Sequence, residues 1–117
     1  MAETRRHGSL SELPVEEPYE GVRRCSFDSE GATVTAYRFA PGARFPLHRH
    51  PQEQITLIEQ GEVELTVSDT TTLLRAGDWS IVGADVEHGI RAGPQGARFF
   101  AIVVPRRMSS SAYLVVG

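Results

Sequence analysis

The chain has 117 residues, a hydrophobic fraction of 40% and a formal net charge of −3, a composition typical of one ordinary globular domain. Its twelve basic residues are all arginine, so Schiff-base chemistry and P-loop nucleotide binding, which need a lysine amine, are excluded. The N-terminus is polar and no apolar run approaches the roughly 18 residues of a membrane helix, so we expect neither a signal peptide nor a membrane span. The single cysteine, Cys25, rules out an internal disulfide and favours a reducing cytoplasm.

The N-terminal part of the chain lacks the pattern of a core element. Residues 1–12 mix charges, glycine and serine without periodicity, and we expect a flexible arm there. Leu13–Tyr19 contains two prolines, which exclude a central strand but suit an extended segment along a sheet edge. We expect the folded barrel over residues 13–108. Residues 109–117 are expected to form a tail whose last strand adds to this barrel or to that of a partner subunit.

The middle of the chain consists of short runs of alternating apolar and polar residues, separated by turn residues. Gly61 lies between two such runs and is expected to permit a tight reversal of the chain. No segment keeps a helical period over three turns, so the pattern predicts an all-β barrel or a double-sheet jelly roll. The expected strands cover residues 22–27, 32–39, 54–60, 62–67, 72–75, 79–82, 86–90, 97–104 and 113–116.

Two histidines one residue apart, His48 and His50, are the first candidates for a binding site. Side chains alternate across a strand, so residues of equal parity share a face, and Gln52 and Gln54 lie on the same face as this pair. If that face lines the barrel interior, two imidazoles and a carboxamide oxygen converge there. Such donors suit one divalent ion, with zinc, manganese, iron and nickel all compatible.

The glycines around these histidines have the spacing of the first motif of the cupin superfamily, which the chain resembles. The motif's usual Glu is replaced here by Gln, and every interval fits: Gly42, five residues, His48, His50, three residues, Gln54, six residues, Gly61. The stretch Gly77–Ala92 keeps the spacing of the second cupin motif and supplies a third histidine, His88. Its Pro, second Gly and Asn positions are occupied by Gly83, Asp85 and Ala92.

This resemblance implies a cupin-type double-stranded β-helix, in other words a jelly-roll barrel. It also implies that one divalent metal ion is held inside by His48, His50, Gln54 and His88. A homodimer is the assembly that the resemblance implies, and Leu13–Val22 is the expected contact segment.

Within the superfamily, the run HRHPQEQI is similar to small cupins that ketonise unsaturated uronates with a single metal. That similarity implies general acid/base work by a carboxylate and an arginine near the end of the last core strand. The arginine corresponds to Arg107, whereas the carboxylate position falls on Ala101, which cannot transfer protons. The departure counts against this particular sugar activity and leaves the metal site unaffected.

Two further residues are candidates for the chemistry. Gln52, on the face of the ligands, is a candidate for holding a water or the substrate. Tyr37 is a candidate if its phenol points inward, with a core aromatic as the alternative. Glu53 and Glu87 have the opposite parity to the ligands and are expected at the surface. The aromatic residues expected to pack the barrel are Phe45, Phe99, Phe100 and Trp79.

The change from Glu to Gln54 removes one negative charge from the ligand set, which makes the metal a stronger Lewis acid and raises its affinity for anions. We therefore expect a small anionic or enolisable substrate. One hypothesis is a metal-dependent isomerase or tautomerase, cyclase or lyase of a sugar-acid or natural-product pathway, or a dioxygenase if the metal is iron or nickel. The other is a non-catalytic cupin that binds a small ligand or metal. No DNA-binding helix pattern or basic stripe is visible, so nucleic acid is not an expected partner.

Overall fold

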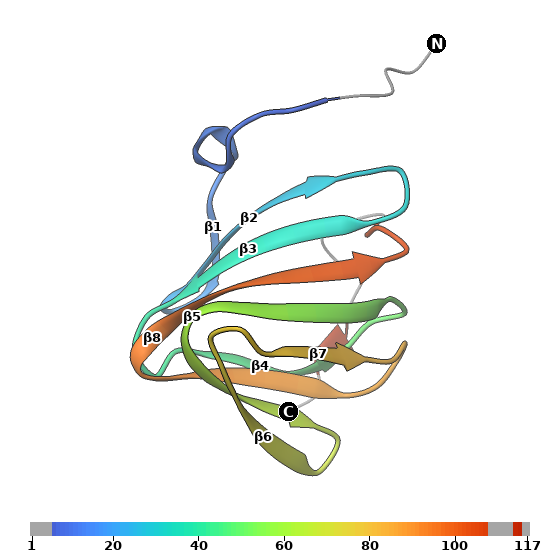
Figure 1. Ribbon diagram of the computed structural model, residues 1–117. Helices are drawn as coiled ribbons and strands as arrows, with labels where there is room; N and C mark the ends of the chain where they lie inside the picture. Colours follow the sequence, from blue (N-terminus) through green and yellow to red (C-terminus); the bar gives the residue numbers. More distant parts are fainter. Residues whose placement is uncertain (1–5, 108–113, 116–117) are drawn as a thin grey trace.

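Residues 6–107 and 114–115 are described by the computed structural model, and they form an antiparallel barrel of nine strands (Figure 1). Within these residues no helix has the length and apolar composition needed to cross a bilayer. The elements in chain order are a 3-10 turn η1 (Leu10–Glu12) and the strands β1 (Glu16–Tyr19), β2 (Val22–Asp28), β3 (Thr33–Phe39), β4 (Arg44–Arg49), β5 (Glu53–Val67), β6 (Thr70–Arg75), β7 (Trp79–Val82), β8 (His88–Val104) and β9 (Leu114–Val115).

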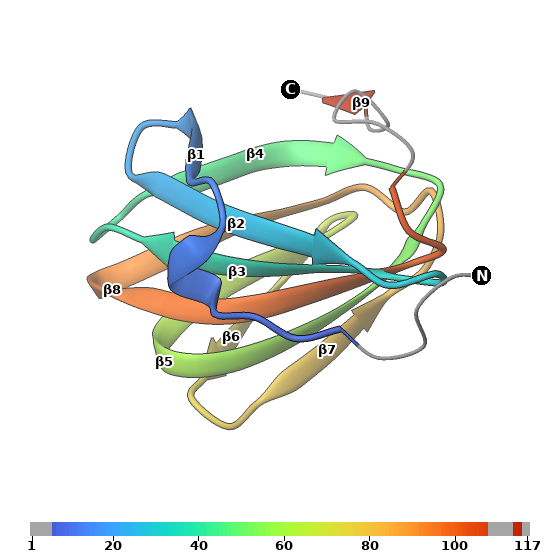
Figure 2. The ribbon, with the colours of Figure 1, turned by 90° about the horizontal axis from the view of Figure 1, so that it is seen from above.

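Two long strands, β5 and β8, connect the two layers of the barrel. Their ladder runs from Glu53↔Val104 to Val67↔His88, and each strand bends partway so that its two halves belong to different layers. One layer has the order β1-β2-β3-β8-β5-β7, whose main strands follow one another from top to bottom in Figure 1. The other layer has the order β9-β4-β8-β5-β6. Figure 2, seen from above, shows β4 and β7 on opposite sides of the molecule.

The bends lie at Gly61 on β5 and Gly96 on β8, both at positive φ (79° and 75°). A Cβ on Gly61 would collide with the carbonyl oxygen of Gly96, so the two backbones approach as closely as they do only because Gly61 is a glycine. The ladder shifts register on either side of Gly61 but continues through it. The expected tight reversal at Gly61 is therefore wrong: the runs on either side of it form one bent strand. The two strands expected over residues 86–90 and 97–104 are likewise parts of one strand, β8, with residues 86 and 87 just before its start.

The N-terminal segment follows the expected path along a sheet edge. Among the strands that the structure describes, β1 pairs with β2 alone, and η1 precedes it, closed by a capping box between Ser9 and Glu12. At the other end of the chain, β9 pairs with β4 of the same chain at His48 and Arg49. The remaining residues of the expected arm (1–5) and of the expected tail lie outside the described residues.

The core is an aromatic cluster that borders the histidines. Tyr37 stacks on Phe99 with ring centroids 5.0 Å apart, and Phe39 lies at the same distance from Phe99. Phe45 contacts Tyr37 on one side and the His48 ring on the other, with centroids 6.2 and 4.6 Å away. The inward placement of Phe45 and Phe99 confirms that part of the prediction.

Trp79 does not pack the barrel, contrary to the prediction. It is 64% exposed, because its position on β7 has the opposite parity to Val82, which is 1% exposed and faces the interior. Phe100 is half-buried and lies on the outward face of β8 for the same reason, between the inward Phe99 and Ala101. Aromatic character alone did not show which face of the strand these two residues occupy.

Candidate metal centre

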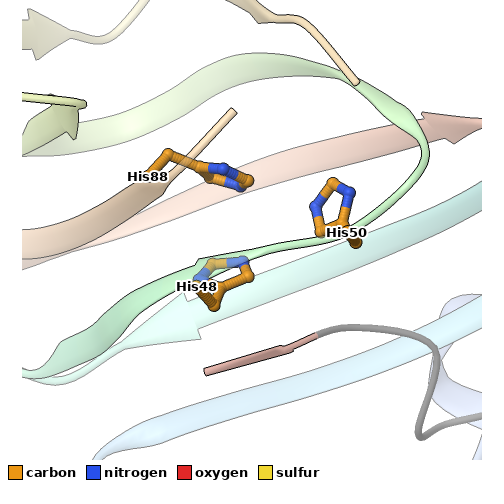
Figure 3. Close-up of side chains that lie close together, drawn as sticks. All are labelled: His48, His50 and His88. Atoms are coloured by element: carbon orange, nitrogen blue, oxygen red, sulfur yellow. The ribbon is translucent and has the colours of Figure 1, made fainter. Parts of the chain in front are cut away.

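The three candidate histidines come together because β4 and β8 are paired. His48 on β4 lies directly opposite His88, the first residue of β8. His50 follows the end of β4, where its carbonyl oxygen accepts a hydrogen bond of 2.8 Å from the Asp85 amide. The rings gather at one point inside the barrel mouth (Figure 3), with centroids 4.3 Å apart for His48 and His88 and 4.9 Å apart for His50 and His88.

The predicted alternation of faces is observed along this segment. His48, His50, Gln52 and Gln54 are 6%, 2%, 3% and 9% exposed, whereas Arg49 and Glu53 are exposed. Pro51 interrupts the ladder without changing this parity. The sequence pattern therefore correctly assigned these four side chains to the interior.

Each histidine ring is fixed by a hydrogen bond from Nδ1 to a backbone carbonyl. A carbonyl only accepts, so Nδ1 carries the proton and the lone pair of the neutral ring is on Nε2. Metal-binding histidines are commonly oriented in this way. The acceptors and distances are Pro46 at 2.8 Å for His48, Gln52 at 3.0 Å for His50, and Val86 at 2.9 Å for His88.

The remaining nitrogens fit a cation. One ring nitrogen from each histidine lies within 4.8 Å of the other two. Two bonds of about 2.1 Å to one ion would bring such nitrogens within about 4.2 Å, so a small inward movement of the rings completes the site. Nε2 of His88 is buried and has no hydrogen-bond partner among the described residues, which is the state expected of a nitrogen whose partner is an ion. The residues present therefore fit a metal.

Burial keeps these imidazoles neutral. Burial, together with the positive charges that His88, His50 and Arg107 can carry, lowers the pKa of His48 to about 3. Burial is also the main cause that lowers the pKa of His50 and of His88. Neutral imidazole is the form that binds a metal, so the ligands are ready to bind at neutral pH.

Gln54 presents its carboxamide oxygen to the same point. Its Oε1 lies 3.1 Å from Nε2 of His50, while its Nε2 donates to Oγ1 of Thr56 at 3.1 Å. With the proton of His50 on Nδ1, two lone pairs face each other across 3.1 Å, and a cation held by both atoms would replace that repulsion with two bonds. Thr56, which is fully buried, sets the amide orientation. Thr56 was not among the residues that the sequence pattern indicated, although it is two residues from Gln54 and shares its face.

Of the three candidate catalytic residues, Arg107 is close to the histidines. Its charge contributes to lowering the pKa of all three rings, and its backbone amide donates to Oγ1 of Thr33 at 2.9 Å. Gln52 is buried, and its Oε1 has no hydrogen-bond partner among the described residues. Tyr37 lies in the aromatic core, with its hydroxyl 3.5 Å from Nη1 of Arg24.

The structure also shows the surroundings of Ala101, which stands where the resemblance implied a catalytic carboxylate. Ala101 is buried on the inner face of β8, between Thr35 of β3 and Thr56 of β5 in the ladder. Glu53 is exposed and Glu87 only half-buried, consistent with their parity. The inner wall beside the histidines is thus lined with hydroxyl groups at the position where the sugar-acid cupins that the sequence resembles carry an acid.

This chain belongs to the cupin family: the family described as "Cupin domain" matches residues 36–103, which include all three histidines and Gln54. The fold is thus the one that the two glycine–histidine motifs predicted, and the three histidines lie together as expected. One divalent metal ion is the cofactor that such a set of ligands suits.

Three known proteins are similar to this chain in sequence or in fold. Dimethylsulfoniopropionate lyase DddW of Ruegeria pomeroyi is 36% identical over 61 residues, which are 52% of this chain and 40% of that protein. The chain thus spans less than half the length of this relative. An RmlC-like cupin from Shewanella frigidimarina superposes with a TM-score of 0.78 at 24% identity, over 92% of this chain and 95% of that one. KdgF from Halomonas sp. superposes with a TM-score of 0.77 at 22% identity, over 87% and 97% of the two chains.

Proposed function

We propose that this protein is a metal-dependent cupin enzyme acting on a small anionic or enolisable substrate, as an isomerase or tautomerase, a cyclase or a lyase. One observation carries the proposal: three neutral histidine rings and a carboxamide oxygen face one buried point beside the Arg107 guanidinium. A metal held by His48, His50, His88 and Gln54 supplies Lewis acidity to a carbonyl or carboxylate oxygen. All four protein ligands are neutral, so the site keeps the full positive charge of the ion and favours an anion.

Arg107 is the proposed anchor for a substrate carboxylate. A guanidinium binds a carboxylate through two parallel hydrogen bonds, and here it adds a second positive charge next to the ion. The bond from its backbone amide to Thr33 fixes the chain at this point, so the side chain starts from a defined place. Gln52 has a buried acceptor oxygen and is proposed to receive a hydrogen bond from a substrate hydroxyl or a water.

Tyr37 is the proposed proton-transfer group. Its ring is buried in the barrel core, and the hydroxyl oxygen lies 3.5 Å from Nη1 of Arg24. The position where the related sugar-acid cupins have a carboxylate is occupied here by Ala101, so a proton must be moved by a different group.

The similarity to DddW favours the lyase among these reaction types. That relative is named as a lyase of a propionate derivative, which is a carboxylate, as the charge of this site requires. The homodimer and the cytoplasmic location expected from the sequence are part of this proposal.

A second candidate is an iron- or nickel-dependent dioxygenase, or a cupin that binds its ligand without turnover. The observation in its favour is the hydroxyl-lined wall around Ala101, which offers no acid or base at that position. Neither oxygen chemistry on a redox metal nor simple ligand binding needs an acid or base at that position.

Metal analysis of protein purified without added metal, together with an oxygen-uptake assay, separates these candidates. Dimethylsulfoniopropionate and an unsaturated uronate are the first substrates to test. Zinc or manganese with product formation and no oxygen uptake supports the proposal, and iron with substrate-linked uptake supports the dioxygenase. Arg107→Gln should then raise KM for the carboxylate about tenfold or more, as for loss of a charged hydrogen bond. Its exposed neighbour provides the control variant, Arg106→Gln, which should leave KM unchanged.

A further inference from the structure

The layer that contains β4, β8, β5 and β6 has a hollow of about 450 Å³ on its outward face, which we call the outer hollow. Gly89 of β8 lies buried at its floor. Because this position alternates with the inward His88, a residue there faces outward, and a glycine leaves the space above the strand open. The walls are Pro46 and Leu47 of β4 and, on the other side, Thr66 of β5 and Thr71 of β6.

The outer hollow is separate from the metal centre, although both are built on the same strands. His88 and Gly89 are neighbours in the chain, and their side-chain positions point to opposite faces of β8. Pro46 lines the hollow, whereas its carbonyl oxygen holds Nδ1 of His48 at 2.8 Å. A molecule in the outer hollow therefore contacts the outer side of the strands that carry the histidines and does not reach the rings.

One end of the outer hollow is lined by three exposed charged side chains. Arg44 on β4 is the direct partner of Arg91 on β8, and Arg91 is in turn the direct partner of Glu64 on β5. Within residues 6–107 and 114–115, none of the three takes part in an ion pair. Two like charges directly opposite each other repel, so an anion between the two guanidinium groups relieves an unfavourable contact.

The charge balance at this end favours a carboxylate over a phosphate. Two arginines and one glutamate leave a net charge of +1, which matches a group with a single negative charge. A guanidinium binds a carboxylate through two parallel hydrogen bonds. A phosphate group carries about −1.5 to −2 charges near neutral pH, and the Glu64 carboxylate would repel it more strongly.

The threonine wall of the outer hollow suits hydroxyl groups. The side-chain oxygens of Thr66 and Thr71 lie 2.9 Å apart and share one hydrogen bond. One O–H group and several lone pairs of this pair stay available, so the pair both donates and accepts, as a ligand hydroxyl also does. Pro46 and Leu47 on the opposite wall offer an apolar surface to the carbon skeleton of such a ligand.

We propose that the outer hollow is a second ligand site, which binds a small hydroxylated carboxylate of the sugar-acid class. Its volume is in the lower half of the range of small-molecule sites, about 300–1,000 Å³, and suits a molecule the size of a monosaccharide. The carboxylate lies between Arg44 and Arg91, and the hydroxyl groups face Thr66 and Thr71. The inference concerns the outer face of the barrel and does not depend on the proposed activity.

Isothermal titration calorimetry of the metal-free protein tests this proposal, because removal of the metal excludes anions that bind to the ion. D-galacturonate, D-glucuronate and D-gluconate are the probes, and at least one should bind with a stoichiometry of one. D-galactose lacks the carboxylate and acetate lacks the hydroxyl groups, so each should bind about tenfold or more weakly than the best of these acids. The proposal fails if none of the three acids binds at millimolar concentration, or if acetate or inorganic phosphate binds as tightly as the best of them.

Charge variants locate the bound acid. Arg44→Gln and Arg91→Gln should each weaken binding about tenfold or more, as for loss of a charged hydrogen bond. Glu64→Gln keeps an acceptor oxygen but removes the negative charge, so it should strengthen binding, by about threefold or more. Arg75→Gln is the matched control: Arg75 is an exposed arginine on β6 of the same layer, it does not line the outer hollow, and its removal should leave the affinity unchanged.

The inner site provides a second control. Arg107→Gln removes the arginine close to the histidines and should leave the affinity of the metal-free protein for the acid unchanged. If Arg107→Gln abolishes binding while Arg91→Gln does not, the acid binds inside the barrel and the proposal is wrong. An affinity that falls in Glu64→Gln would equally contradict the charge argument.

Discussion

His48 and His88 are direct partners across β4 and β8, and their ring centroids lie 4.3 Å apart. Two neutral rings with Nε2 lone pairs aimed at the same point gain nothing from each other. The arrangement is useful only when a cation binds both nitrogens. Until then the buried Nε2 of His88, which has no hydrogen-bond partner within residues 6–107 and 114–115, has a cost. Metal binding and the stability of the barrel mouth should therefore be coupled.

Removal of one ring should abolish that coupling. Zinc or manganese at 100 times its dissociation constant should stabilise the wild-type protein by about 2.7 kcal/mol, seen as a rise in Tm. For His88→Ala the same addition should produce no rise, and the bound metal should fall below about one-tenth of an equivalent, as expected for loss of a ligand from a site of four. His7→Ala is the control, since His7 is exposed and distant in sequence from the cluster. A metal-dependent Tm rise that survives in His88→Ala would contradict the ligand assignment.

The metal-free protein should lose stability as the pH falls from 7.5 to 5.5. Burial lowers the pKa of His48 to about 3, below its ordinary value of 6.5, so across this range the unfolded chain binds protons that the folded chain does not. The free energy of unfolding then falls with falling pH, with a slope that approaches about 1.4 kcal/mol per pH unit for each such histidine. Urea unfolding at several pH values measures the slope. His48→Phe should reduce it and His7→Ala should not, whereas a flat profile in the wild-type protein would mean that the folded state binds protons on these rings as readily as the unfolded chain does.

A carboxylate at position 54 should weaken the binding of anions. Gln54→Glu puts a negative charge against the metal, and at an effective dielectric constant of about 20 this costs an anion on the order of 1–3 kcal/mol, or tenfold to a hundredfold in affinity. Titration with oxalate or another small carboxylate, at equal metal occupancy, measures the difference. Gln60→Glu provides the same change of charge at an exposed position of β5 and should have little effect. Equal affinity in Gln54→Glu and the wild-type protein would show that the ligand charge does not control anion binding.

The clustering of the candidate ligands was predictable because it depends on local parity. Alternation along one strand is enough to direct His48, His50 and Gln54 to the same side, and their exposures confirm it. The sequence spacing to His88 then follows from the second glycine-bounded motif. Parity also directs Thr56 to the face of Gln54, but it does not show that the two side chains form a hydrogen bond, and for that reason Thr56 was missed as the residue that orients the Gln54 amide.

The all-β fold was also predictable, but its two longest strands were not. Gly61 separates two alternating runs in the sequence, and this pattern is the same for a hairpin turn and for a bent strand. The difference depends on whether the partner strand bends at the same level, as β8 does at Gly96. The prediction that Trp79 packs the barrel was wrong for a related reason, because the face on which its side chain lies depends on which residues of β5 are opposite to it.

Two motif glycines allow the bend to be tested with a matched pair of variants. Gly42 and Gly61 both have a positive φ, 71° and 79°, so alanine at either position pays about 1–2 kcal/mol for the left-handed backbone. At Gly42 an added Cβ has no atom within 4 Å, whereas at Gly61 it collides with the Gly96 carbonyl and lies 3.0 Å from the Cα of Ala97.

Gly61→Ala should therefore cost clearly more free energy of unfolding than Gly42→Ala, by about 1–3 kcal/mol, which is typical for strain introduced into a close-packed region. The difference measures how closely β5 and β8 approach at their bends, because the backbone term is common to both variants. Urea unfolding of the two metal-free variants, with equal m-values, is the measurement. Equal losses of stability would mean that the two strands can separate at this point. The bent pair would then not be the rigid support that holds Gln54 against the histidines.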